Sequence, residues 1–172
     1  MSAAPRFELL APHHNRNSFD CGEESLNAYL QRYARQNAKR DYGITTVAVF
    51  EEHPTEIAAY YTLANSKIEP TRWPADLKKP PLDAPTILLA RLAVDARFQG
   101  RGLGEWCLIH VFESVLAVAQ ISAVAALEVE ALNERAARYY AHYGFRALQN
   151  TPHHLYLPTP LIRQYLAARL AP

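Results

Sequence analysis

A glycine-rich turn is the stretch of this sequence whose residue types could do chemistry. Residues 88–95 predict a buried strand and 96–98 a short polar break, after which Gly100, Gly102 and Gly104 alternate. Because glycine has no Cβ, a ligand can come close to the backbone N–H groups of such a turn. The following segment predicts a helix, whose first N–H groups and positive dipole end point into the turn. The stretch therefore predicts an anion site, most naturally for phosphates.

The spacing of these glycines excludes two common phosphate loops. A dinucleotide fingerprint needs G-x-G-x-x-G, whereas Gly100, Gly102 and Gly104 give G-x-G-x-G. A P-loop needs Gly-Lys followed by Ser or Thr, whereas Glu105 follows the last glycine here. The spacing Q-x-x-G-x-G, which begins at Gln99 soon after Leu-Ala-Val-Asp, resembles the acetyl-coenzyme A pyrophosphate loop of the GNAT superfamily of N-acetyltransferases.

A second motif lies at residues 136–145, which read Ala-Ala-Arg-Tyr-Tyr-Ala-His-Tyr-Gly-Phe. It resembles the A-x-x-[F/Y]-Y-x-x-x-G-F signature that ends the fold in the same superfamily. The resemblance implies that Tyr140 stands beside the thioester sulfur and acts as the general acid. A tyrosine on an amphipathic helix is, in isolation, more often a packing residue, and this is what we expect of Tyr139 and Tyr143.

The resemblance also implies a set of cofactor contacts. Backbone groups of Leu92 and Val94 are expected to pair with the pantetheine arm, and a backbone N–H near Ala93 to polarise the thioester carbonyl. N–H groups of the glycine turn are expected to hold the pyrophosphate. The expected acetyl-coenzyme A contacts are Leu92, Ala93, Val94, Gln99, Gly100, Arg101, Gly102, Leu103, Gly104 and Asn133.

The acceptor must be a neutral amine, because only an unprotonated nitrogen attacks a thioester. A free α-amino group has a pKa of about 7.7–8.0 and is partly deprotonated near neutral pH. A lysine side chain, with a pKa of about 10.4, is almost fully protonated there. No His or Glu stands at a recognisable general-base position, which favours an α-amine. Cys107 lies inside a predicted helix, and we expect it to be buried and not to act as a nucleophile.

The composition describes an ordinary globular protein. Of 172 residues 49% are hydrophobic and 20% charged, and the net charge is +1, so no global field indicates a nucleic-acid partner. Cys21 and Cys107 have no C-x-x-C spacing, which fits a reducing compartment. The first residues do not resemble a signal peptide, and the weakly polar run 115–127 is too short to span a bilayer. We therefore expect one domain over residues 1–172, in the cytoplasm and away from membranes.

Strands and helices alternate along the chain. Strands are predicted at 6–10, 44–50, 56–63, 87–95, 123–129, 145–148 and 155–157, and helices at about 18–40, 103–120, 133–143 and 159–170. Asn133 and Gly144 are expected to cap the third of these helices. Residues 66–85 hold five prolines and predict a long loop with at most one helical turn.

Basic residues gather on one face of the first predicted helix. Helical spacing places Leu26, Tyr29, Leu30 and Tyr33 on one face, and the face opposite carries cations and no acid. Such a face is commonly only solvated, but it could also contact nucleic-acid phosphates. The candidate phosphate contacts are Arg32, Arg35, Lys39 and Arg40 on the helix, Lys78 and Lys79 in the proline-rich loop, and Arg91 next to the cofactor strand.

Resemblance to one branch of the superfamily extends over essentially the whole chain. Residues 19–30, 59–63, 89–95 and 155–158 resemble the acetyltransferase toxins of bacterial type II toxin–antitoxin modules, which acetylate the α-amino group of aminoacyl-tRNA and block translation. This implies an α/β (α+β) fold with a mixed, mostly antiparallel central sheet, splayed between its fourth and fifth strands and flanked by helices. It also implies a ribbon-helix-helix-type antitoxin as partner and a homodimer. Ala59 in place of a glycine, and Glu128 in a strand where an apolar residue is expected, depart from the pattern.

Other functions stay open at this stage. One alternative is an acetyltransferase of a small amine. Binding of bulk tRNA, and the salt dependence of that binding, would distinguish it from an enzyme that acts on aminoacyl-tRNA. Another is a non-catalytic module that binds coenzyme A or RNA. The intact glycine turn and Tyr140 argue against this alternative. His13-His14 and His153-His154 are adjacent pairs without the spacing of chelating ligands, so we expect no metal site.

Overall fold

The computed structural model describes residues 4–171, which divide into two compact units. Unit 1 holds the described residues up to Ala64 together with Ala90–His110, and unit 2 holds Asn65–Leu89 and the described residues from Val111 onward. The strand order of the seven-stranded sheet is β1-β2-β3-β4-β5-β7-β6. The mixed α/β class is confirmed, with β4 parallel to β5 and the other described pairings antiparallel. The splay and the single domain over 1–172 stay predictions.

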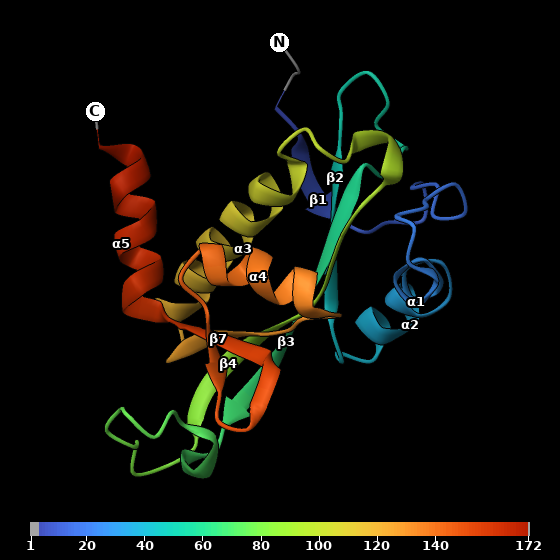
Figure 1. The fold of residues 1–172 in the computed structure, drawn as a ribbon. Helices are drawn as coiled ribbons and strands as arrows, with labels where there is room; N and C mark the ends of the chain where they lie inside the picture. Colours follow the sequence, from blue (N-terminus) through green and yellow to red (C-terminus); the bar gives the residue numbers. More distant parts are fainter. Residues whose placement is uncertain (1–3, 172) are drawn as a thin grey trace. The chain divides into compact units, whose positions relative to one another are not determined.

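Unit 1 is built on three antiparallel strands. β1 (Arg6–Leu9) pairs with β2 (Ile44–Val49), which pairs with β3 (Ala59–Ile68), and the three lie side by side in Figure 1. β-branched and aromatic residues favour such strands, and their inward side chains fill the core. This core gathers Phe19, Tyr29, Leu30, Ala34, Val47, Val49, Ile57, Tyr60 and Ala93.

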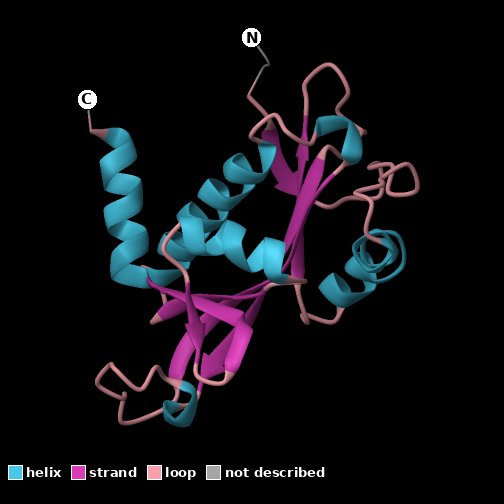
Figure 2. Cartoon of the chain, viewed as in Figure 1, coloured by secondary structure: helices cyan, strands magenta, loops and turns pink. Residues whose placement is uncertain are grey.

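The helical segment of unit 1 begins later than predicted and is not a uniform α-helix. It runs through α1 (Glu24–Ala28), a π-helical turn (Tyr29–Tyr33) and α2 (Ala34–Lys39), drawn as helix in Figure 2. The start is delayed because the Asp20 carboxylate accepts from the backbone N–H of Gly22, at 2.9 Å, and from the Asn27 amide, at 2.8 Å, so the chain turns before the helix begins.

The π-helical turn corrects the predicted buried face. The N–H of Ala34 bonds to the carbonyl of Tyr29, five residues back, which inserts an extra residue into the turn. Tyr33 is therefore 52% exposed, and Ala34 takes the fully buried position that the helical spacing gave to Tyr33.

Unit 2 continues the sheet with parallel and antiparallel pairs. β4 (Ala84–Val94) pairs with β5 (Ala126–Glu130) from Thr86 opposite Ala126 to Leu89 opposite Val129. β5 pairs with β7 (Thr151–Pro158), and β7 with β6 (Arg146–Leu148). The core of this unit gathers Ile68, Ala84, Ala126, Leu148 and Tyr156.

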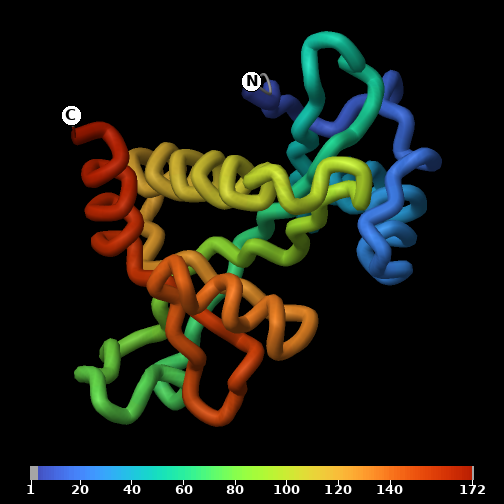
Figure 3. Tube along the Cα trace, turned by 45° about the horizontal axis from the view of Figure 1, so that its top comes forward, coloured from blue at the N-terminus to red at the C-terminus, as the bar shows by residue number. Residues whose placement is uncertain are grey.

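Helices of unit 2 agree with the predicted ones. α4 (Glu134–His142) is capped by Asn133, whose side chain accepts from the N–H of Ala136 at 2.9 Å. Its C-cap is Tyr143, and Gly144 follows with φ 95°. α5 (Thr159–Leu170) lies beside the end of α3 (Leu103–Ala119) in Figures 1 and 3. There the Tyr165 ring meets the Phe112 ring edge-on, with centroids 5.4 Å apart.

The proline-rich segment is shorter than predicted. β3 runs to Ile68, and a 3-10 turn (Pro70–Arg72) is the one helical turn that the sequence allowed. The remaining loop is closed by an ion pair between Lys67 and Asp83 at 2.6 Å. In the part of the chain that the structure describes, no helix is long and apolar enough to cross a membrane.

Candidate functional site

The end of β4 and the start of α3 are joined by the glycine turn, all within unit 1. A 3-10 turn (Ala96–Phe98) leads into it, and Gly100 and Gly102 adopt φ 75° and 78°, the left-handed region that favours glycine. A Cβ at either position would meet nothing within 4 Å, so the backbone of the turn faces open space. The structure thus brings together the predicted contacts from Leu92 to Gly104.

The Gln99 side chain holds the turn to its surroundings. Its amide Nε2 donates to the carbonyl of Val94 at 2.9 Å and to the carbonyl of Cys21 at 3.0 Å. The first bond fixes the turn to the end of β4, and the second fixes it to the segment that precedes α1. Since the amide nitrogen is used within the chain, the contact that Gln99 offers an anion comes from its backbone N–H.

Asp95 stabilises the glycine turn through hydrogen bonds, and this role was not foreseen from the sequence. Its side chain is almost fully buried, and its carboxylate accepts from the N–H groups of Asp20 (3.1 Å) and Arg97 (3.0 Å) and from Arg97 Nε (2.8 Å). Burial alone would raise the pKa of this carboxyl, but the hydrogen bonds and charge of Arg97 outweigh it and lower the pKa. The one signal in the sequence for this role of Asp95 was the position of a charged residue directly after an apolar strand.

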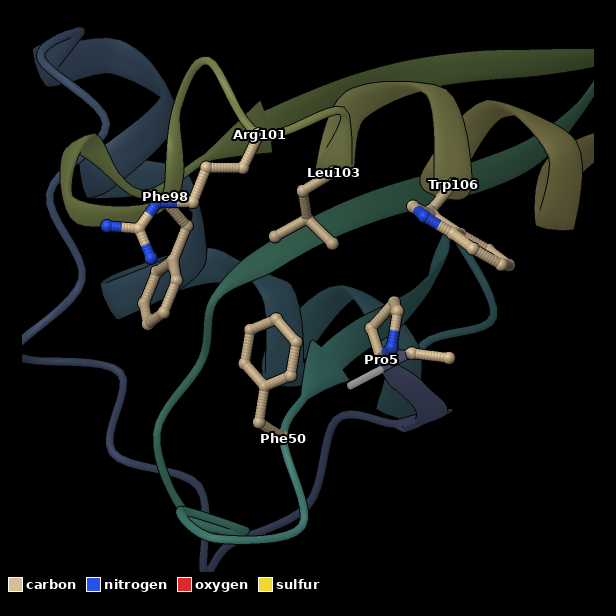
Figure 4. A pocket seen from close by; sticks show the side chains of 7 residues that line it. Pro5, Phe50, Phe98, Arg101, Leu103 and Trp106 are labelled. Atoms are coloured by element: carbon tan, nitrogen blue, oxygen red, sulfur yellow. The ribbon is translucent and has the colours of Figure 1, made fainter. Parts of the chain in front are cut away.

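Two side chains of the turn face a small hollow, shown in Figure 4. The hollow has about 110 Å³ and is lined by Ala4, Pro5, Phe50, Phe98, Arg101, Leu103 and Trp106. The Arg101 guanidinium lies 5.8 Å from the centre of the Phe98 ring, and Leu103 points between the aromatic rings. These side chains pack against unit 1, which leaves the backbone of the turn as its ligand-facing part.

The basic face of the π turn and α2 borders a second, polar hollow. It has about 270 Å³ and is lined by Arg16, Gln31, Arg32, Arg35, Gln36 and Lys39. The structure therefore brings together three of the predicted phosphate contacts. Arg40 is not in this lining and stands at the C-cap of α2. Arg16 is a cation that sequence reasoning missed, because it lies outside the helix.

Arg91 of β4 is held by an aromatic ring. Its guanidinium carbon lies 3.8 Å from the centre of the Tyr29 ring, a close cation–π contact. Tyr29 belongs to the π-helical turn, so the contact joins the helical segment to the strand that enters the glycine turn. Arg91 is half-buried, and no described residue forms an ion pair with it.

The remaining predicted residues belong to unit 2. Tyr140 is 6% exposed, and its ring meets the rings of Tyr139 and Phe145 edge-on, at 5.3 and 5.5 Å. The side-chain oxygen of Asn133 is used as a helix cap. Lys78 and Lys79 are exposed in the proline-rich loop. The relation of these residues to the glycine turn stays a prediction.

Comparison with known proteins decides the family. The model of the acetyltransferase (GNAT) family matches residues 13–145. The chain belongs to this family. It is an N-acetyltransferase, and its fold is the one found in solved GNAT structures.

Three matches, to two relatives, carry more specific names. A tRNA-acetylating toxin of Mycobacterium tuberculosis (strain ATCC 25618 / H37Rv) is 32% identical to this chain. The match covers 81% of this chain and 83% of the toxin's own length. The structure of AtaT complexed with acetyl-methionyl-tRNAfMet is 28% identical, covering 94% of this chain and 99% of that chain, with a TM-score of 0.86. A Tyr-to-Phe mutant of AtaT, bound to the C-terminus of the antitoxin AtaR and acetyl-CoA, is 27% identical, covering 95% and 99%, with a TM-score of 0.81.

The glycine turn of this GNAT chain has the geometry of a main-chain anion site. Two left-handed glycines open the backbone to a close approach, and α3 presents its first N–H groups directly after them. Gln99 and Asp95 hold the turn in place by bonds to the segment before α1. A preformed, main-chain anion site of this kind loses little entropy when it binds phosphates.

Glu128, the unexpected acid of β5, is fully buried in unit 2 and satisfied by hydrogen bonds. Thr86 Oγ1 donates to Oε1, and His154 Nε2 lies 2.5 Å from Oε2. Arg72 donates to Nδ1 of His154 at 2.7 Å, so the ring proton is on Nε2 and is donated to Glu128. Burial alone would raise the pKa of Glu128, but the hydrogen bonds from His154, Thr86 and Ser66 lower it. The acid thus anchors the base of the proline-rich loop through His154 and Arg72.

Glu8, His13 and His14 approach one another in unit 1, which the sequence did not foresee because Glu8 comes from β1. Their ligand atoms lie within 4.8 Å. The N–H of Ala11 donates to His14 Nδ1 at 2.9 Å, so the ring proton sits on Nε2, 2.7 Å from Glu8 Oε1. These bonds engage both ring nitrogens of His14, and the expectation that the chain holds no metal stays a prediction.

Proposed function

We propose that this enzyme acetylates the α-amino group of aminoacyl-tRNA and so blocks translation, acting in the cytoplasm as the toxin of a toxin–antitoxin pair. The observation that carries the proposal is the polar hollow with four cations, Arg16, Arg32, Arg35 and Lys39, on a chain with a net charge of only +1. A basic surface this local fits a phosphate-bearing acceptor better than a small amine. The names of the relatives support the same substrate.

Acetyl-coenzyme A would be held by the backbone of β4 and of the glycine turn. The thioester supplies the acetyl group when it is bound. Backbone groups of Leu92 and Val94 would pair with the pantetheine arm, and the N–H groups from Gln99 to Gly104 would bind the pyrophosphate. A backbone N–H near Ala93 would polarise the carbonyl that the amine attacks. Asn133 is the further contact that we propose in unit 2.

Tyr140 would supply the proton that the coenzyme A sulfur needs as it leaves. A phenol holds its proton at neutral pH and can give it to a thiolate within hydrogen-bond reach. The amine needs no strong base, since an α-amino group with a pKa of about 7.7–8.0 is partly neutral already. Cys107 is fully buried, and burial raises the pKa of its thiol to about 12, so it takes no part as a nucleophile.

The acceptor tRNA would lie on the basic face. Arg32, Arg35 and Lys39 would contact its phosphates from one hollow, and Arg91 would face the acceptor end. Arg40, Lys78 and Lys79 are further phosphate contacts that we propose outside the hollow. We also propose an antitoxin of the ribbon-helix-helix type as protein partner, and a homodimer as the assembly.

A substrate competition tests the proposal. Release of the coenzyme A thiol would be followed with bulk aminoacyl-tRNA, deacylated tRNA, free amino acids or a polyamine as acceptor. We expect thiol release only with aminoacyl-tRNA, falling steeply as salt is raised because phosphate contacts are screened. Release with a small amine alone would point to a small-molecule acetyltransferase. The absence of release with every acceptor, while coenzyme A still binds, would indicate a regulatory module.

A further inference from the structure

The polar hollow beside the π turn contains one cation, Arg16, that comes from outside the helical segment. We propose that Arg16 is the anchoring cation of a preformed seat for one backbone phosphodiester of the RNA, completed by Arg32, Arg35 and Lys39. The RNA as source of the phosphate rests on the proposed function. The seat itself rests on the lining of the hollow and on the way in which Arg16 is held.

Arg16 reaches the hollow from the loop that precedes α1, not from the helix. It is half-buried, and its Nη1 donates to the carbonyl of Gln31 at 2.8 Å. A guanidinium carries five N–H donors in a planar fork, so one bond leaves others for a ligand. The bond to Gln31 thus holds one end of the fork at the hollow and leaves the other donors for a ligand.

The bond from Arg16 ends in the π-helical turn. The N–H of Ala34 bonds to the carbonyl of Tyr29 and passes over the carbonyl of Leu30, where a regular α-helix would bond. Gln31 lies in the same widened turn, and its carbonyl accepts from Arg16. π turns inside helices are frequent at functional sites, and in this one a side chain from another segment bonds to the backbone.

The charge of the hollow calls for an anion. Its lining includes four cations and no acid, and among residues 4–171 none of these cations forms an ion pair. Cations held around one space repel each other, and an anion placed between them removes that repulsion. Its size, about 270 Å³, suffices for a phosphate group, and arginine forks match phosphate oxygens in pairs.

Arg16→Gln tests the seat, with Arg163→Gln on exposed α5 as matched control. The KM for aminoacyl-tRNA would be measured over a salt series, together with the KM for acetyl-coenzyme A and the melting temperature. For Arg16→Gln we expect a KM for aminoacyl-tRNA about 10-fold higher at low salt. The slope of log KM against log salt should fall by about 0.7–0.9, the contribution of one phosphate contact. The KM for acetyl-coenzyme A should not change, and Arg163→Gln should behave as wild type.

Arg16→Lys separates charge from packing. A lysine keeps the point charge but not the fork, so the salt slope should return to that of wild type while part of the KM defect persists. If the melting temperature falls in Arg16→Gln while the salt slope stays that of wild type, Arg16 is a packing residue and the proposal is wrong.

Failure of the seat and failure of the proposed function give different results. A wild-type enzyme that acetylates aminoacyl-tRNA, together with an unchanged Arg16→Gln, overturns only the seat. If wild type does not acetylate aminoacyl-tRNA, binding of a labelled RNA hairpin tests the seat directly. A weaker affinity and a lower salt slope in Arg16→Gln support it, and equal values overturn it. Loss of binding to a poly-glutamate peptide alone, with RNA binding intact, would assign the hollow to an acidic peptide and likewise overturn it.

Discussion

The backbone N–H of Asp20 donates to the buried carboxylate of Asp95 at 3.1 Å, and the N–H of Ala96 donates back to the carbonyl of Asp20 at 2.8 Å. These reciprocal bonds, together with the bond from Gln99 to Cys21, join the glycine turn to the segment that starts α1. The proposed cofactor turn and the proposed RNA-binding helix are therefore supported by the same few residues.

Asp95→Ala should destabilise the protein and weaken cofactor binding together. Removing the buried carboxylate leaves the backbone N–H groups of Asp20 and Arg97 without their acceptor and takes one of its two carboxylate partners from the Arg97 guanidinium, which costs about 3 kcal/mol. Denaturant unfolding measures this loss, and the KM for acetyl-coenzyme A should rise in the same variant. Glu56→Ala is the matched control, because Glu56 pairs with Arg97 from a more exposed position and should cost less than about 1 kcal/mol. Equal losses in the two variants would contradict the role given to Asp95.

Tyr140→Phe should lower turnover about 100-fold or more, since removing a general acid costs that much where the leaving group needs a proton. The KM for acetyl-coenzyme A should change little, because the ring that packs against Tyr139 and Phe145 is retained. Tyr143→Phe makes the same chemical change one helical turn away and should keep wild-type turnover. Near wild-type turnover in Tyr140→Phe would exclude this hydroxyl as the acid.

Reversing two cations of the hollow, with Arg35→Glu and Lys39→Glu combined, should abolish acetylation of aminoacyl-tRNA. Each reversal replaces an attraction to phosphate by a repulsion, so a loss in kcat/KM of about 100-fold or more is expected. Acetyl-coenzyme A affinity, measured by calorimetry, should stay intact. Arg163→Glu, a single reversal on exposed α5, is the control for a charge reversal away from the hollow. Unchanged acetylation would mean that the face is only solvated.

Glu128→Gln should change the pH dependence of stability. The pKa of Glu128 is lower in the folded state than in the unfolded state, where it is about 4.3. The ionised form therefore contributes stability above the unfolded pKa, and this contribution is lost as the pH falls through the folded pKa. The variant should be less stable than wild type by about 2 kcal/mol at pH near 6, a gap that narrows steadily toward pH near 3. Urea unfolding over this range measures it. A gap that is constant with pH would show that the Glu128 charge is not what stabilises the network.

Local signals in the sequence were enough for the glycine turn and for α4. Gly100 and Gly102 take the left-handed conformation that their type favours, and Asn133 and Gly144 cap α4 as their types predict. Each of these outcomes depends on residues within a few positions along the chain, which is why single-sequence reasoning reached them.

The long-range contacts could not be predicted from the sequence. The π turn follows from packing Tyr29, Leu30 and Ala34 into the unit 1 core, which helical spacing cannot foresee. Glu128 contacts His154 because β5 pairs with β7, and this pairing sets Glu130, two residues further along β5, opposite His154. Arg16 meets Gln31 across 15 positions. None of these partners carries a sequence signal of its own.

The chemical position of the acetyl group tests the central claim most directly. Aminoacyl-tRNA would be incubated with labelled acetyl-coenzyme A, the ester bond cleaved with mild alkali, and the released amino acid analysed by mass spectrometry. We predict that the label leaves the tRNA with the amino acid, as its N-acetyl derivative, and that tRNA deacylated beforehand takes up no label. Label that stays on the tRNA after alkali, or no transfer to charged tRNA while a small amine is acetylated, would contradict the account.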